Sequence, residues 1–563
     1  MIALAHPRAA RASPPTPVLY EVAPVVESGQ LTSLAVKLTF EADESGVTTL
    51  RLPDGYGSGR DFWKNVRDLE VSGARVVDTS EPGLRKLQAR GGRRIAVRYR
   101  IVSPLSGEPR IEDASTYQPV IRPRWFYAVG SALFALPYAR DDAPARFVWN
   151  GGRIGMPAAS DLQADRGEFG SLSGAITLRD VRNSALVGGW DLSIIRSGVV
   201  RVASIGAFRF DMAEAAQLSE RIVTAQTAFW GDRPRPFLIT IVPHHASSPL
   251  STSWQGTGRS GGFATRLTPN VELRDLTFFF AHENFHRWNS SALGGQGSDG
   301  RPGFWFSEGF TDFFALRLMV RSGVMSPHDF ADVWNGMLAA YAASPARTLP
   351  NGEIAARFWT DPHAKRMAYQ RGALLAALWD WKIRRERGGA LSLDDLLRAQ
   401  RRAVAARDPS DQTPAFVLFP KIAAAHDVDL TADIARYLDR GEPIELPADV
   451  FGPCATVQWR EQPDYDRGWD VAATSRAGGV VTGLREGSPA WRAGLRNGMR
   501  LLERIAGRPE DSSVEAAVRA RAGDGTEQIY RFKPEGRGRV SLQHMTLTDL
   551  GAGPRCREPG AGF

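Results

Sequence analysis

The sequence predicts a multidomain α+β protein, and its length and two changes of hydrophobic pattern carry that prediction. With 563 residues, the chain is too long for one hydrophobic core. Residues 18–200 are strand-like and predict an N-terminal all-β domain of the sandwich type. Residues 201–450 change to helical spacing and predict a mainly helical domain, and residues 455–557 combine short strands with one helix.

Alternation and turn residues justify the first region. Residues 34–40 partly alternate between apolar and polar side chains, and residues 94–101 also alternate. The turn sequences Pro53-Asp54-Gly55 and Gly91-Gly92 separate such runs. Short strands divided by turns are typical of a β-sandwich.

Helical periodicity justifies the second region. Residues 213–230 place apolar side chains at helical spacing, and residues 237–242 form a mainly apolar run typical of a buried strand. Further helices are expected at 275–289, 306–322, 367–385 and 393–406.

The charge pattern indicates a solvated basic surface. The net charge is +8 and the pI is about 9.6, but the arginines are scattered and no sustained Lys/Arg block occurs. We expect no nucleic-acid partner, because no recognisable module accompanies a basic stripe. No run reaches the ~18 apolar residues of a membrane span, so no transmembrane segment is predicted.

Two weak signals favour export to the periplasm or the extracellular space, with the cytoplasm as the alternative. Ala10-Arg11-Ala12 resembles a small-residue cleavage site. Cys454 and Cys556 flank a compact C-terminal segment, either as two buried thiols or as a disulfide. A disulfide would indicate an oxidising compartment.

The most informative residues are His282, Glu283 and His286, which form a His-Glu-x-x-His pattern. On a helix, positions i and i+4 share one face, so both imidazoles can bind one Zn²⁺ while Glu283 polarises a water. The alternative is a pair of satisfied core histidines. Glu308 follows on a second apolar segment, and two histidines with one carboxylate leave a zinc position open. Its alternative is a buried ion pair.

Two further residues have open roles. Asp312 lies one turn after Glu308 and either fixes the tautomer of a ligating histidine or serves as an ordinary surface or capping aspartate. Tyr369 is either a core or rim tyrosine or a hydroxyl that stabilises an oxyanion. Three histidines are weaker candidates for stabilising the oxyanion, namely His244, His245 and His363.

Taken in order, three motifs resemble the glycyl aminopeptidase family of zinc metallopeptidases, which belongs to the thermolysin-like gluzincins. They are HENFHRWN at 282–289, EGFT at 308–311 and YQRGA at 369–373. The resemblance implies a thermolysin-like catalytic domain between an N-terminal β domain and a C-terminal PDZ domain. It also implies one Zn²⁺ per chain on His282, His286 and Glu308, Glu283 as general base and acid, and Tyr369 as the transition-state hydroxyl.

The same resemblance identifies further positions. Asn289, next to Trp288, matches the residues after the second histidine and is expected to form hydrogen bonds at the helix end. Gly261 and Gly262 match a Gly-Gly-x-Glu-His segment that lines the substrate cleft, but the carboxylate expected to meet a free amine is missing. The sequence therefore leaves exopeptidase and endopeptidase activity open.

Residues 479–507 resemble a PDZ domain, with Ser488 and Pro489 as a typical helix start. PDZ domains can bind an extended peptide by adding a strand, so a peptide ligand is a possible partner here. The alternative is a structural or regulatory cap.

The sequence thus predicts a zinc metallopeptidase that hydrolyses peptide bonds with metal-activated water and is aminopeptidase-like. Its substrate would be a peptide or an unfolded protein. Two alternatives stay open: a non-catalytic peptide-binding protein on a peptidase scaffold, and a zinc hydrolase of non-peptide amides or esters.

Overall fold

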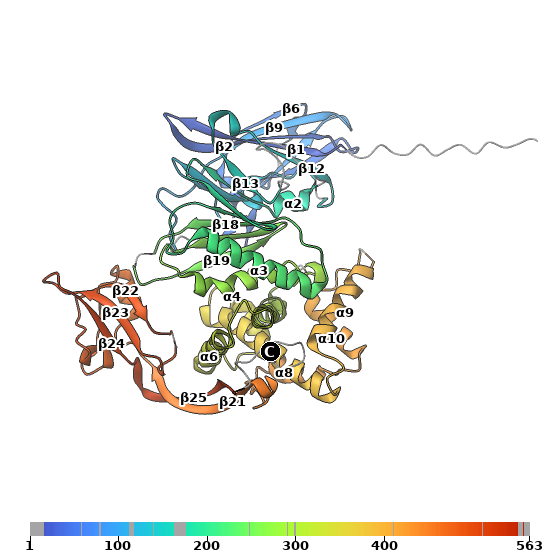
Figure 1. Cartoon of the computed structure of the whole chain (residues 1–563). Coiled ribbons are helices and arrows are strands. Elements are labelled where there is room, and N and C mark those ends of the chain that lie inside the picture. The colour runs from blue at the N-terminus through green and yellow to red at the C-terminus, as the bar shows by residue number, and fades with distance from the viewer. Residues whose placement is uncertain are drawn as a thin grey trace, which may run out of the picture.

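The computed structural model has three regions in chain order, which Figure 1 shows from blue to red. It describes residues 16–57, 59–77, 80–111, 117–138, 140–162, 176–246, 248–289, 291–297, 300–408, 410–508, 510–549, 556 and 563. Several sheets lie beside a helical region, so the prediction of a multidomain α+β protein is confirmed. None of the described helices combines the length and apolarity that crossing a bilayer requires.

The N-terminal region is built from two main sheets that share a core. One sheet has the strand order β14 (Ile176–Thr177), β12 (Pro144–Trp149), β1 (Val18–Glu27), β2 (Gln30–Glu41), β9 (Arg94–Ile101) and β6 (Val66–Ser72). The other has the order β10 (Val120–Ile121), β11 (Trp125–Val129), β15 (Ala185–Gly189) and β13 (Ala158–Ser160). Alternate residues of β9 are buried, as its sequence predicts, and Phe126 meets Trp149 across the core at 5.2 Å between ring centroids.

Small strands complete this region. A three-stranded sheet has the order β3 (Val47–Arg51), β8 (Leu84–Gln88) and β7 (Arg75–Val77), and a short pair joins β4 (Gly55–Tyr56) to β5 (Gly59–Arg60). Two short helices, α1 (Gly130–Leu133) and α2 (Leu178–Arg182), directly follow β11 and β14 in the chain. Thr177 and Asp180 form a capping box at the start of α2.

A five-stranded sheet connects the β region to the helices. Its order is β16 (Ser193–Ser197), β17 (Val200–Ser204), β18 (Phe237–Pro243), β20 (Gly262–Leu267) and β19 (Trp254–Arg259). The predicted boundary at residue 200 therefore falls at the start of β17, inside this sheet. Strand β19 pairs antiparallel with β20 and forms an edge. One face of the sheet packs on the N-terminal core, and helices α3 (Met212–Trp230) and α4 (Leu273–Phe285) cover the other (Figure 1).

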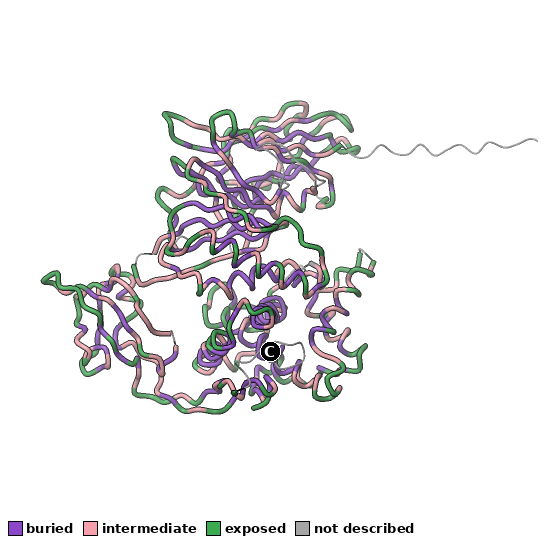
Figure 2. The backbone as a smooth tube through the Cα atoms, in the orientation of Figure 1, coloured by how far each residue is buried: buried purple, intermediate pink, exposed green. Residues whose placement is uncertain are grey.

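The helical region surrounds α8 (Pro362–Glu386), whose middle residues are almost all buried (Figure 2). Its other main elements are the π-helical turn η5 (Trp305–Phe310), α5 (Thr311–Arg321), α6 (Pro327–Ala343), α7 (Asn351–Arg357), α9 (Leu393–Ala406), α10 (Ala415–Ala424) and the π-helical turn η6 (Ile434–Asp439). The predicted helices are present, but α4 ends at Phe285 rather than near residue 289, and a turn takes the chain to Asn289.

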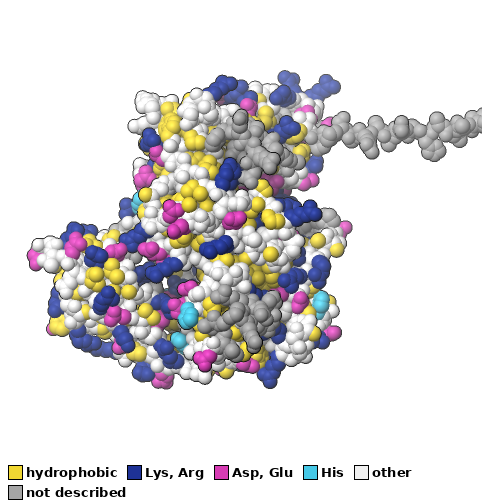
Figure 3. Space-filling model, in the orientation of Figure 1, with side chains coloured by type: hydrophobic (Ala, Val, Ile, Leu, Met, Phe, Trp, Pro, Cys, Tyr) yellow, Lys and Arg dark blue, Asp and Glu magenta, His cyan; other side chains and the backbone are white. Residues whose placement is uncertain are grey.

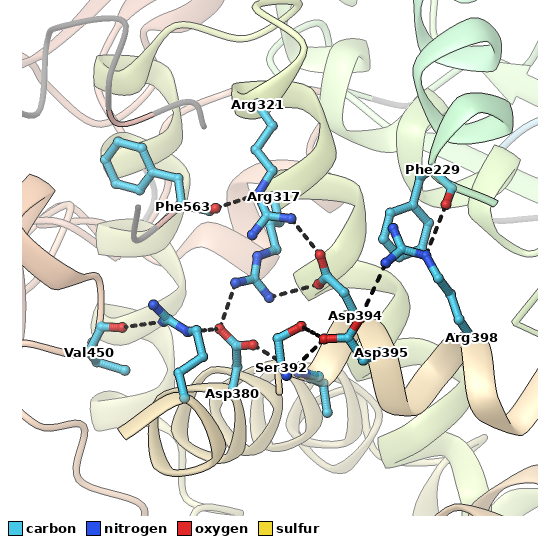
Figure 4. A network of polar contacts seen from close by, with 12 residues as sticks. Phe229, Arg317, Arg321, Asp380, Ser392, Asp394, Asp395, Arg398, Val450 and Phe563 are labelled. Carbon is cyan, nitrogen blue, oxygen red and sulfur yellow. Dashed lines mark hydrogen bonds and ion pairs between the residues drawn. The ribbon is translucent and has the colours of Figure 1, made fainter. Parts of the chain in front are cut away.

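A buried ion network fixes three of these helices to one another (Figure 4). Arg317 on α5 lies 2.6 Å from Asp380 on α8 and 3.1 Å from Asp394 on α9. Arg321 pairs with Asp394 at 2.7 Å, and Arg384 pairs with Asp380 at 2.9 Å. Burial alone would raise the pKa of Asp380, but Arg317 and Arg384 hold it below its ordinary value.

The C-terminal region leaves the helical core on a long ribbon of β21 (Ala455–Tyr465) and β25 (Glu535–Leu547). Beyond the ribbon, α12 (Val471–Arg476) and α13 (Pro489–Arg492) pack with a sheet of β22 (Arg500–Ala506), β23 (Ala516–Arg521) and β24 (Glu527–Phe532) around their own core. Asn335 on α6 holds the ribbon, since its side chain both donates to and accepts from the backbone of Met545.

The two cysteines form a disulfide, which decides between the two alternatives left by the sequence. Cys454 and Cys556 are joined across 102 residues of chain, so the bond closes the loop that carries the whole C-terminal unit. Both cysteines belong to the same buried cluster as the helical region.

Lys and Arg side chains are spread over the face seen in Figure 3 without forming a single stripe.

We predict that the double substitution Cys454→Ala/Cys556→Ala lowers the free energy of unfolding. Loss of a cross-link over such a loop costs up to about 4.7 kcal/mol, because the unfolded chain regains its freedom. Thermal unfolding with and without a thiol reductant measures the effect. The reductant should lower the Tm of the wild type and leave the double variant unchanged; equal responses would contradict the prediction.

We also predict that Arg317→Met destabilises the helical core by roughly 3–5 kcal/mol, because it leaves Asp380 buried without its main partner. The matched control is Arg357→Met, which removes an exposed i,i+4 pair to Glu353 on α7 and should cost under about 0.5 kcal/mol. Urea unfolding of both variants measures the difference, and equal costs would rule out a stabilising role for the buried network.

Candidate metal centre

Helix α4 carries His282 and Glu283 near its buried C-terminal end, and His286 is its C-cap. Leu276 and Phe280 are fully buried, so the helix is held in the core by its apolar side. His282 and His286 are one turn apart, and their Nε2 atoms lie 3.0 Å from each other. The C-terminal end of α4 and its cap residue therefore present two imidazoles to the same point.

Glu308 reaches that point from η5. Its Oε2 lies 3.3 Å from His282 Nε2 and 3.4 Å from His286 Nε2. Donors about 2.1 Å from a tetrahedral zinc lie about 3.4 Å from one another, so the spacing suits such an ion. Within the described residues, His282, His286 and Glu308 are the one group with metal-binding geometry. The π-helical turn is a local departure from α-helix that often occurs at functional sites.

The three side chains are strongly coupled. Burial alone would raise the pKa of Glu308, but the two imidazoles hold it below its ordinary value. The pKa of His282 is raised well above its usual range, because the carboxylates of Asp312 and Glu308 outweigh the effect of burial. A divalent cation bound here would neutralise the negative charge of the same two buried carboxylates, Asp312 and Glu308.

Asp312 lies on the far side of His282 from Glu308. Its Oδ1 is 2.7 Å from Nδ1 of His282, the ring nitrogen that does not face the other two side chains. A carboxylate at this nitrogen keeps the proton on Nδ1 and leaves the lone pair of Nε2 free for a metal. Asp312 is thus buried at the start of α5 in contact with His282.

Asn289 ties the end of the α4 turn to η5. Its Nδ2 donates to the carbonyls of Phe306 and Ser307 and to Oγ1 of Thr311, at 2.9, 3.2 and 2.9 Å. These bonds hold the segment that carries Glu308 against the helix that carries both histidines.

Glu283 is buried next to the histidines and has a free carboxylate oxygen. Its side chain is 7% exposed, and Oε2 has no hydrogen-bond partner among the described residues. Burial raises the pKa of Glu283, while the two imidazoles oppose that rise. Strand β19 passes directly over it, since a Cβ built at Gly256 would lie 2.5 Å from Glu283 Cδ. A buried, unpaired carboxylate beside a metal-binding group suits a base that takes a proton from water.

Tyr369 on α8 stacks on His282, with ring centroids 5.8 Å apart and an interplanar angle of 22°. Burial, and then the nearby carboxylates of Glu308, Asp312 and Glu283, raise the pKa of its hydroxyl well above the ordinary value. The group therefore stays protonated and can donate a hydrogen bond.

A close contact between two glycines brings Tyr369 to the site. A Cβ built at Gly309 would lie 2.3 Å from Gly372 Cα, and one built at Gly372 would lie 1.8 Å from the carbonyl oxygen of Trp305. Helices η5 and α8 thus touch backbone to backbone, one residue after Glu308 and three residues after Tyr369.

The three other candidate histidines lie outside the metal-binding group. His363 is exposed at the start of α8. His244 is buried, and its Nε2 lies 3.2 Å from the carbonyl oxygen of Ser253. The backbone of His245 forms an isolated β-bridge with that of Arg110.

The predicted substrate residues Gly261 and Gly262 lie at the turn from β19 into β20. The N–H of Gly261 donates to Asp161 Oδ2 at 3.1 Å, and Gly262 pairs with Leu238 in the sheet. The strand that borders Glu283 is instead β19. Glycine at alternate positions 256 and 258 was the available sequence signal, because glycine inside a strand often marks a close backbone approach.

A cavity of about 590 Å³ opens beside His286, and sequence reasoning missed most of the residues that form it. Most of the lining comes from β4, α2, β19, the turn after α4 and the segment between α3 and β18, and α9 adds Arg401. Tyr56 of the N-terminal region and Arg259 of β19 lie at its wall, and Gly262 also lines it.

Comparisons with known proteins agree with this geometry. Residues 275–375 match the family model described as M61 glycyl aminopeptidase, which covers α4, Glu308 and Tyr369. The chain therefore carries the catalytic segment of a zinc-dependent metallopeptidase. No curated protein matches it.

A solved structure similar to nearly the whole chain shows the fold. An aminopeptidase N family protein from Idiomarina loihiensis matches with a TM-score of 0.65 and 15% identity, over 96% of this chain and all of that one. An M1 zinc metallopeptidase from Deinococcus radiodurans matches at 16% identity with a TM-score of 0.46, over 77% of this chain and 96% of that one. The first likeness extends the shared fold to nearly the whole chain.

We predict that Gly372→Ala lowers peptidase activity at least tenfold. The added methyl group would push α8 away from η5 and move Tyr369 away from His282. Overpacking of this kind costs about 1–3 kcal/mol of stability. The control is Gly352→Ala on α7, where a Cβ meets nothing within 4 Å. Steady-state kinetics and thermal unfolding of both variants measure the effect. Full activity of Gly372→Ala would show that the close contact is not needed.

Proposed function

We propose that the protein is a zinc metallopeptidase that hydrolyses peptide bonds, with aminopeptidase-like activity. The observation that carries the proposal is the meeting of His282, His286 and Glu308 beside the unpaired carboxylate of Glu283. Two imidazoles and one carboxylate suit Zn²⁺ and leave a coordination position open. When bound, the ion would act as a Lewis acid and lower the pKa of water.

Each protein group then has a defined role. Glu283 accepts a proton from the attacking water at Oε2 and delivers it to the leaving nitrogen. Tyr369 donates a hydrogen bond to the oxygen of the scissile carbonyl as negative charge develops there. Asp312 keeps the tautomer of His282 fixed, and Asn289 keeps Glu308 in reach.

The edge strand β19 suits a peptide substrate. It stands at the end of the five-stranded sheet, and an extended peptide can pair with such an edge through main-chain hydrogen bonds. One face of the strand meets Glu283 at Gly256. Glycine at 256 and 258 lets the strand approach α4 closely, which brings a paired peptide within reach of the catalytic side chains. A peptide or an unfolded chain is therefore the substrate class that the site favours.

The C-terminal unit is, in this proposal, a PDZ-like domain of residues 455–557. In support, Ser488 caps α13 by accepting from the N–H of Trp491, and a three-stranded sheet packs on that helix. A peptide ligand there would add a strand to this sheet. Export to the periplasm or outside the cell is supported by the disulfide, since such bonds persist in oxidising compartments.

We predict that the wild type holds about one zinc per chain and cleaves a mixed peptide library. Glu283→Gln should keep the zinc and lose roughly 10²–10⁴-fold in kcat, because only the proton acceptor is removed. Removal of zinc with a chelator should abolish cleavage, and added zinc should restore it. Metal analysis and mass spectrometry of the products measure both effects and give the cleaved positions.

The control is Glu272→Gln at the start of the same helix, a partly exposed residue paired to Arg209 that should leave activity unchanged. A wild type that holds zinc but cleaves no peptide would contradict the proposal. So would a Glu283→Gln variant with full activity.

A further inference from the structure

The cavity beside His286 has an unusual charge. Two aspartates face a set of six arginines: Arg179, Arg233, Arg235, Arg259, Arg287 and Arg401. Both aspartates already have partners. Asp232 accepts from Arg401 at 2.7 Å and from the indole of Trp288 at 2.7 Å, and Asp180 accepts from the backbone of Thr177 at 2.9 Å. The cavity therefore has an excess of positive charge.

Arg259 is the buried member of this set. Its side chain is 7% exposed, and Nε and Nη1 have no hydrogen-bond partner among the described residues. Burying a charge whose donors lack partners is costly, so the site is stabilised when an anion binds.

The orientation of Arg259 is fixed. Its Nη2 donates to Thr257 Oγ1 at 2.5 Å, and its guanidinium lies over the ring of Tyr56 at 4.5 Å from the centroid. The Tyr56 hydroxyl is 2.7 Å from the same Thr257 oxygen. These contacts occupy one nitrogen and one face of the guanidinium and leave Nε and Nη1 buried without a partner among the described residues.

The strand geometry connects Arg259 to the reaction. Successive side chains of β19 point to opposite faces, so Gly256 and Gly258 face α4 while Thr257 and Arg259 face the N-terminal region. A Cβ at Gly258 would lie 3.7 Å from His286 Cβ, so Gly258 is in contact with a metal-binding residue. Arg259 is the next residue along the strand. A substrate paired along β19 would reach this guanidinium close to the scissile bond.

We propose that Arg259 binds a carboxylate of the substrate beside the scissile bond, and that the enzyme prefers peptides with this group. The inference rests on the proposed peptidase function. A buried guanidinium with two unpaired nitrogens attracts a carboxylate, which can accept charge-assisted hydrogen bonds from it, whereas an ammonium group would be repelled. The carboxylate has two sources, which are an Asp or Glu side chain and a free C-terminus.

The test compares matched peptides on the zinc-loaded full chain. One series carries Glu or Gln at each position around the cleaved bond, with both ends blocked, and a second series carries a free or amidated C-terminus. We expect kcat/KM to favour one carboxylate series over its neutral partner by roughly 10- to 100-fold, as for a charge-assisted hydrogen bond. The series that shows the preference identifies the source.

Variants assign the preference to one residue. Arg259→Gln should reduce the ratio of acidic to neutral kcat/KM to near 1, and Arg259→Lys should retain part of it, because the charge remains without the fork. Arg233→Gln, which removes an exposed arginine of the same cavity, should keep the ratio within about twofold of the wild type. A purely structural role for Arg259 would lower both rates and leave the ratio unchanged.

Failure of the inference is separable from failure of the peptidase proposal. A wild type that cleaves both members of each pair equally, or an Arg259→Gln variant that keeps the preference, overturns the inference alone. If no peptide is cleaved, the peptidase proposal fails, and binding of the same labelled peptides to zinc-loaded protein decides the carboxylate site. Tighter binding of the acidic member, lost in Arg259→Gln, supports it; equal binding overturns it.

Discussion

The arrangement of the site depends on the backbone contact between Gly309 and Gly372. Only at this distance can η5 and α8 bring Glu308 and Tyr369 to the same pair of histidines, because any side chain at either glycine would overlap the opposite backbone. Further from the metal-binding residues, the buried pairs of Arg317 join α5, which directly continues η5, to α8 and α9. Close backbone packing and ion pairing thus both hold the η5–α5 segment against α8.

The buried charges of the site stabilise one another electrostatically. Burial is costly for a carboxylate, and Glu308 and Asp312 offset it through the two nitrogens of His282. Glu283 is the exception, since one of its oxygens has no partner in the described chain. A protein that retains such a group in its core has a use for it, and proton transfer to and from water is the use that the neighbouring metal-binding group supports.

The sequence predicted the parts of this site that depend on local spacing. His282, Glu283 and His286 lie on one helix, so their proximity follows from the helical repeat, and the later motifs located Glu308 and Tyr369. The cavity could not be predicted in this way, because Tyr56, Asp232 and Arg259 come from segments far apart in the chain and meet only through the packing of the five-stranded sheet. Strand β19 was missed because glycines interrupt its pattern, and the pairing of Cys454 required the folded path of the ribbon to be known.

The chemistry and the specificity of the site come from different elements. The groups that would hold zinc and move protons lie on α4, η5 and α8, all in the helical region. The part of the cavity wall around Arg259 comes from β19 and from the N-terminal region, which supplies Tyr56 and Arg179. The other arginines come from the segment between α3 and β18, the turn after α4 and α9. The two faces of β19 make this division possible: its glycines allow close approach to the catalytic helix, while Arg259 on the other face is held by the N-terminal region. On this view the N-terminal region completes the substrate site, and a substitution at Arg259 would change which peptides are cleaved without changing how they are cleaved.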